Sequence, residues 1–63
     1  MPKTRAKRRF VVCLSSDGYA ASLEPRKIYV ALRDAKAERS GLLRVVDESR
    51  EDYLYSCERF APL

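Results

Sequence analysis

Short apolar runs separated by turn-forming residues constrain the fold of this chain more than any other feature of its sequence. The runs recur at roughly ten-residue spacing, at residues 10–14, 27–32, 41–46 and 52–55. Runs of this length bounded by polar residues are typical of strands rather than helices. Asp17-Gly18 after the first run favours a turn, because glycine tolerates a positive φ. The sequence therefore predicts an all-β domain, a small barrel or sandwich.

The connections between these runs predict the order of the elements. Residues 42–46 and 52–55 form an antiparallel hairpin across a polar turn, and a 3-10 turn over residues 56–59 precedes a closing segment. The loop before residue 27 is irregular, because Pro25 disfavours helical geometry at Glu24, and it buries Leu23 in the core. Residues 33–40 favour a helix but are too few for a stable one without packing, so we expect a single helical turn.

The positive charge of the chain is concentrated at its N-terminus. Of thirteen lysines and arginines, five lie in the first nine residues, which contain no acid: Lys3, Arg5, Lys7, Arg8 and Arg9. The remaining residues are close to neutral. We therefore divide the chain into a mobile basic arm, residues 1–9, and one folded domain, residues 10–63, as its length allows one domain at most.

Three segments resemble the Src-homology-3 (SH3) family of β-barrels. Ser22-Leu23-Glu24 matches the approach to the family's second strand. Gly41-Leu42-Leu43-Arg44-Val45 lies where the family often has Gly-Trp-Trp, and Ser56-Cys57-Glu58-Arg59-Phe60 where it has Pro-Ser-Asn-Tyr-Val. The resemblance implies an SH3-like barrel of about five strands. The chain also resembles a group of short bacterial proteins that end in a similar Glu-Asp-Tyr-Leu-Tyr segment.

The residues that bind proline-rich peptides in the SH3 family are largely replaced. The two tryptophans become Leu42 and Leu43, the proline becomes Ser56 and the tyrosine becomes Arg59, while the loop before the second strand keeps only Tyr19. Grooves for polyproline helices are lined by aromatic side chains. We therefore do not expect a polyproline site.

Composition argues against several other classes of function. The chain has no histidine and only two cysteines, so it cannot complete a tetrahedral zinc site, and we expect no metal and no cofactor. We interpret Cys13 and Cys57 as structural, although Cys57 beside Glu58 and Arg59 leaves weak redox reactivity open. No apolar run is long enough for a membrane span, and no secretory signal is recognisable, so we expect a cytoplasmic protein. We expect no enzyme, because nucleophilic catalysis needs a base beside the nucleophile and the chain lacks histidine, the usual base.

The candidate functional residues are aromatic and basic. We expect a protein-binding module that uses Tyr19, Tyr53 and Arg59 on a rim formed by the 15–26 loop, the 33–40 loop and the 56–59 turn. The alternative is weak nucleic-acid binding, with Lys3, Arg5, Lys7, Arg8 and Arg9 on phosphates and a tyrosine stacked on a base. The sequence leaves open whether Tyr53 and Tyr55 or Leu54 face the core. We interpret the acidic segment 47–52 as a solvated hairpin tip.

Overall fold

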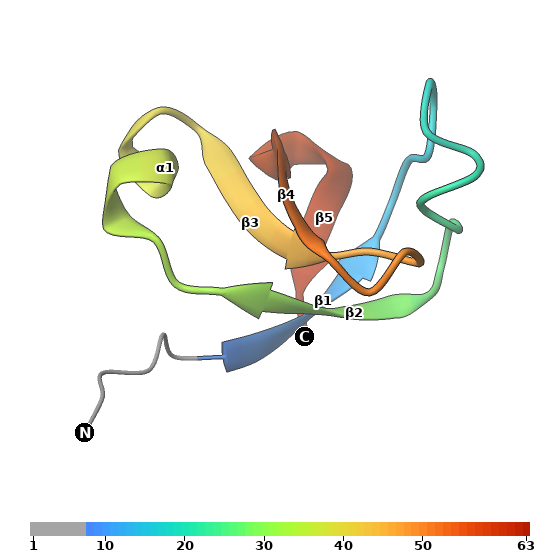
Figure 1. Cartoon of the computed structure of the whole chain (residues 1–63), viewed down its shortest axis with the longest axis horizontal. Helices are drawn as coiled ribbons and strands as arrows, with labels where there is room; N and C mark the ends of the chain where they lie inside the picture. The colour runs from blue at the N-terminus through green and yellow to red at the C-terminus, as the bar shows by residue number, and fades with distance from the viewer. Residues whose placement is uncertain (1–7) are drawn as a thin grey trace.

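A five-stranded antiparallel sheet forms the protein (Figure 1). The computed structural model describes residues 8–63. In chain order the elements are β1 (Arg8–Cys13), β2 (Ile28–Leu32), α1 (Ala35–Arg39), β3 (Leu42–Val46), β4 (Asp52–Ser56), the 3-10 turn η1 (Cys57–Arg59) and β5 (Phe60–Pro62). The strand order across the sheet is β4-β3-β2-β1-β5. The all-β fold, the β3–β4 hairpin and the 3-10 turn are confirmed, and the 33–40 segment contains the expected single helical turn.

The first strand begins two residues earlier than expected. Arg8 and Arg9 pair with Leu32 and Ala31 of β2, so they belong to the sheet rather than to an arm. The hydrogen bonds between paired strands are made by backbone amides and carbonyls, so they do not require apolar side chains. β1 therefore extends to Arg8, because β2 provides an antiparallel neighbour there. Lys3, Arg5 and Lys7 lie outside the described residues.

One face of the sheet carries the core. Alternation along the strands places every second side chain on that face, and Leu23 from the β1–β2 loop covers it, as predicted. In β2 the inward residues are Tyr29 and Ala31, whereas Ile28 is half exposed. The buried cluster comprises Val11, Cys13, Leu23, Tyr29, Ala31, Leu43, Val45, Tyr55 and Phe60.

Capping and ion pairs fix the short helix α1 against the hairpin. The Asp34 carboxylate accepts a hydrogen bond from the Ala37 amide and caps the helix, and Gly41 ends it with a φ of 77°. Arg44 of β3 then joins the two, because its guanidinium contacts Asp34 at 2.8 Å and Asp52 at 3.0 Å.

Backbone hydrogen bonds draw the long β1–β2 loop onto the C-terminal half of the chain. The Leu14 amide donates to the Arg59 carbonyl at 2.6 Å, and the Glu48 amide donates to the Ser22 carbonyl at 3.0 Å. The 19–23 segment folds back on itself through the Leu23 amide, which donates to the Tyr19 carbonyl. These bonds place Tyr19 beside η1 and beside the β3–β4 hairpin.

Candidate functional site

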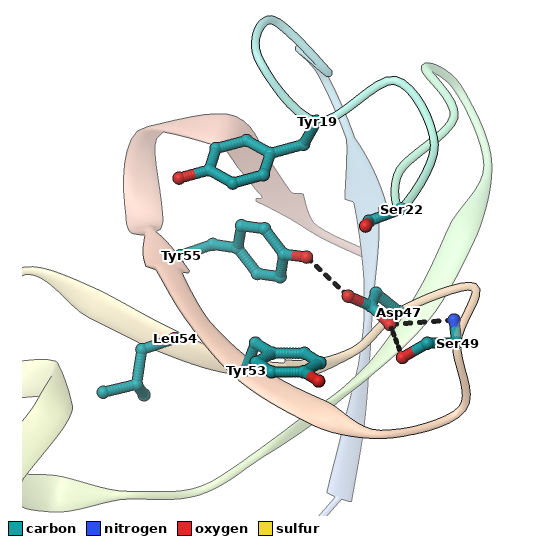
Figure 2. Close-up of a pocket in the computed structure, with 7 residues that line it drawn as sticks. All are labelled: Tyr19, Ser22, Asp47, Ser49, Tyr53, Leu54 and Tyr55. Carbon is teal, nitrogen blue, oxygen red and sulfur yellow. Dashed lines mark hydrogen bonds between the residues drawn. The ribbon is translucent and has the colours of Figure 1, made fainter.

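A groove of about 410 Å³ lies between the β1–β2 loop and the β3–β4 hairpin (Figure 2). Its volume is in the range of sites that hold a small ligand or a few side chains of a partner. The loop, the hairpin turn and β4 all contribute residues that line it. They are Tyr19, Ser22, Asp47, Ser49, Tyr53, Leu54 and Tyr55.

Tyr19 forms one wall of the groove and is held there by two neighbours. Its ring packs edge-on against Tyr55, with the ring centroids 5.1 Å apart and the planes at 86°. The guanidinium of Arg59 lies 4.7 Å from the centre of the Tyr19 ring, within the range of a cation–π contact. Arg59 also donates to the Ser15 carbonyl. Tyr19 nevertheless remains 45% exposed, so part of its ring is free to contact a ligand.

Tyr53 and Tyr55 project from the same side of β4, and this settles the orientation that the sequence left open. Tyr55 faces the core, while Leu54 points to the other side of the strand (Figure 2). Tyr53 lies opposite Val45, next to the turn of the hairpin, and is 49% exposed. Its hydroxyl donates to Glu51 at 3.0 Å. Tyr53 therefore presents a half-exposed aromatic surface to the groove.

Asp47 closes one end of the groove and is 5% exposed, so the interpretation of the whole 47–52 segment as a solvated tip is wrong at this residue. Its Oδ2 accepts the Tyr55 hydroxyl at 2.6 Å, and its Oδ1 accepts the amide and the hydroxyl of Ser49. The side chain turns inward because these donors replace the water that a carboxylate loses on burial.

The hydrogen bond between Asp47 and Tyr55 shifts the pKa values of the two groups in opposite directions. Burial acts to raise the pKa of Asp47, but hydrogen bonds from Ser49 and Tyr55 outweigh it and hold that pKa below its usual value. For Tyr55, burial and the hydrogen bond to Asp47 raise the pKa to about 12. At neutral pH the pair is therefore a neutral phenol donating to an ionised carboxylate.

The structure brings the predicted contact residues together, but not every segment of the predicted rim lines the groove. Tyr19 and Tyr53 line the same groove, and Arg59 packs on Tyr19 from η1. The 33–40 segment supplies no lining residue. Asp47 and Tyr55 also line the groove but were not among the predicted contact residues. The signal for Asp47 in the sequence was Ser49 two residues later, a spacing at which the Asp side chain commonly bonds the local backbone.

A second exposed apolar surface lies on the outer face of the sheet. Phe10 of β1 is 58% exposed and Ile28 of β2 is 50% exposed. Phe10 lies opposite Val30 in the sheet, and Val12 lies opposite Ile28. Apolar surfaces of this kind often mark contacts with other macromolecules. None of the predicted contact residues lies on this face. Its exposed apolar side chains make it a second candidate surface for a partner, besides the groove.

The two cysteines differ in their environment. Cys13 is fully buried, and burial raises the pKa of its thiol. Cys57, at the start of η1, is exposed, so its interpretation as a buried structural residue is wrong. Within residues 8–63 no group of three or more acidic or cysteine side chains is arranged to hold a metal ion. No helix in that part of the chain is long and apolar enough to cross a membrane.

Comparison with protein-family models, with curated proteins and with solved structures finds no match to this chain. The nature of a ligand therefore has to be inferred from the groove itself, from its exposed aromatic side chains and from its charge.

Proposed function

We propose that the chain is an SH3-like barrel that acts as a small non-catalytic binding module for another protein. The element order supports this assignment: a long loop after β1, a hairpin of β3 and β4, and a 3-10 turn before a short last strand that pairs with β1. The observation that carries the functional proposal is the groove, in which Tyr19 and Tyr53 remain about half exposed. Half-exposed tyrosines are enriched at protein interfaces, since each offers a rigid apolar ring and a polar hydroxyl.

The proposed ligand is not a polyproline helix. The positions that carry tryptophan in the SH3 family are occupied by Leu42 and Leu43, and Leu43 is buried in the core. The groove instead combines tyrosines with polar groups of the hairpin turn. We propose a cytoplasmic location, and the unpaired state of Cys13 and Cys57 supports it because thiols stay reduced there.

The charge of the groove favours a protein partner over a nucleic acid. Asp47 and Glu51 lie beside the tyrosines, and both would repel a phosphate backbone that approached Tyr53. Nucleic-acid binding remains the alternative, with the basic N-terminal residues on phosphates. Deleting residues 2–7, which leaves Arg8 and Arg9 paired in β1, would weaken such binding, and moderate salt would abolish it, whereas an apolar protein contact would change little with salt.

Selection of random peptides on the immobilised full chain tests the proposed function. We expect the selected peptides to lose most of their affinity for Tyr53→Ala and to keep it for Phe10→Ala. Phe10 is a matched control, because it is an aromatic residue of similar exposure on the outer face of the sheet. Peptides that depend on Phe10 and not on Tyr53 would move the binding surface to the outer face and refute the groove.

An amide NMR titration with short single- and double-stranded nucleic acids, at low and moderate salt, tests the alternative. Salt-resistant shifts at Tyr19, Tyr53 and Arg59 would identify a nucleic-acid-binding domain and contradict our proposal. Shifts that are confined to the basic N-terminal residues and vanish with salt would indicate nonspecific attraction of charges.

A further inference from the structure

Asp47 is a buried charge that no basic residue in the described part of the chain neutralises. The β3–β4 hairpin carries four acids around its turn, and two of them are paired: Glu48 with Lys27 at 2.6 Å and Asp52 with Arg44 at 3.0 Å. Within residues 8–63, Asp47 forms no ion pair, and its three hydrogen-bond donors are all neutral groups. The carboxylate therefore keeps a full negative charge at the end of the groove.

Two tyrosines flank this charge. Tyr53 and Tyr55 extend from β4 toward the end of the groove that Asp47 and Ser49 close (Figure 2). The face of a tyrosine ring carries negative potential and attracts a cation within about 6 Å of its centre. Glu51, which accepts the Tyr53 hydroxyl and has no ion pair among residues 8–63, adds a second negative charge on the same side. The half-exposed ring of Tyr53 and the two carboxylates converge on one place, and all of them favour a positive ligand.

The opposite end of the groove has the opposite preference. There the guanidinium of Arg59 already lies against Tyr19 and repels a second cation. A positive group is therefore directed to the end formed by Asp47, Tyr53 and Tyr55, and the groove has a defined polarity.

We propose that this end of the groove binds the ammonium group of a lysine side chain presented by the partner protein. The inference rests on the proposed function, because it specifies the partner of the same groove. The hydrogen bonds of Asp47 favour lysine over arginine. Oδ1 already accepts two donors and Oδ2 one, so no free carboxylate edge is left for the two-pronged contact that a guanidinium makes best. A single ammonium group needs only the remaining acceptor site on Oδ2, while its aliphatic chain lies along the Tyr53 ring.

Two lysine analogues test the site directly by amide NMR of the full chain. We expect Nα-acetyl-lysine methylamide to give saturable shifts at Ser49, Tyr53 and Tyr55. Nα-acetyl-norleucine methylamide, which has a similar aliphatic chain without the charge, should bind at least about fivefold more weakly. Equal binding of the two compounds, or shifts elsewhere in the protein, would overturn the proposal.

Three variants identify the groups responsible. Asp47→Asn keeps the shape of the side chain and removes the charge, and Tyr53→Ala removes a half-exposed ring that is not part of the buried core. Each should weaken binding of the lysine compound at least about fivefold, whereas Glu58→Gln, an exposed acid on η1 outside the groove, should leave it unchanged. Unchanged binding to Tyr53→Ala would refute the site even if Asp47→Asn failed to fold.

The peptides from the selection experiment separate this inference from the proposed function. Replacing each lysine of a Tyr53-dependent peptide by norleucine should weaken its binding at least about fivefold. If the peptide still binds equally well, the lysine site is wrong and the protein-binding groove stands. If no Tyr53-dependent peptide exists while the lysine compound binds through Asp47, the partner protein is wrong and the site serves a free ammonium compound.

Discussion

Replacing Tyr55 with phenylalanine removes one hydroxyl and leaves the packing of the ring in place. That hydroxyl donates to Asp47 at 2.6 Å, while the ring keeps its edge-on contacts with Tyr19 and Phe60, at 5.1 and 6.1 Å between centroids. A hydrogen bond to a charged group contributes about 1.5–3 kcal/mol to stability. Asp47 retains both donors of Ser49 and borders an open groove that admits water, so we expect the low end, a loss of about 1.5 kcal/mol.

Thermal and urea unfolding measure this loss. A destabilisation of 1 kcal/mol lowers the melting temperature of a domain this small by about 4–8 °C, so Tyr55→Phe should melt about 6–12 °C below the wild type. The matched control is Tyr53→Phe, which removes an exposed hydroxyl that donates to Glu51. Its stability should stay within about 0.5 kcal/mol of the wild type.

The effect should also depend on pH. Because the folded protein holds the pKa of Asp47 below its ordinary value of 3.8, the stabilisation is fully present above that value and is lost as the pH falls further. The difference in stability between the wild type and Tyr55→Phe should therefore shrink in acid. Equal stabilities at pH 7, or a difference that persists at the lowest pH where both proteins fold, would refute our account of the pair.

The remaining predictions concern the core, the hairpin turn and the thiols. Leu23→Ala should destabilise the fold by about 2–5 kcal/mol in urea unfolding, since Leu23 is 1% exposed and its loss leaves a cavity; a smaller effect would place it outside the core. Arg50 has a φ of 72°, so Arg50→Gly should raise stability by about 0.5–1 kcal/mol, and Arg50→Ala, which keeps the strain, should not. In the native protein a thiol reagent should modify Cys57 rapidly and Cys13 only after unfolding; two fast thiols would contradict the burial of Cys13.

The order of the elements was predictable because each strand has a local signal of its own. Apolar runs mark the strands, Asp17-Gly18 follows the end of β1 and Pro25 lies shortly before β2. Leu23 was recognisable as the one large aliphatic residue of the 15–26 loop. The inward face of β2 was not predictable, since Ile28 and Tyr29 are both apolar enough for the core. The register of β2 with its neighbouring strands determines which of the two residues faces the core, and neither residue alone specifies that register.

The aromatic lining of the candidate groove was predictable from the sequence, and its buried charge was not. Tyr19 and Tyr53 were recognisable as large side chains without an obvious core role. Composition around the hairpin turn predicts exposure of all its acids, and for Glu48, Glu51 and Asp52 this holds. Asp47 differs because Tyr55, eight residues later, and Ser49 supply the donors that permit its burial. The first of these contacts depends on the register of β3 and β4, which no local pattern specifies.

The walls of the groove come from two regions that are far apart in the sequence: residues 19–22 of the β1–β2 loop, and residues 47–49 and 53–55 of the β3–β4 hairpin. The groove forms only when folding brings these two regions together, so the folded chain is the state that can bind a ligand there. A ligand that occupies it stabilises the folded state by mass action, by about 2.7 kcal/mol at a concentration one hundred times its dissociation constant. In a domain this small such a gain moves the melting temperature by many degrees. Melting temperature alone can therefore screen candidate ligands before the partner is known.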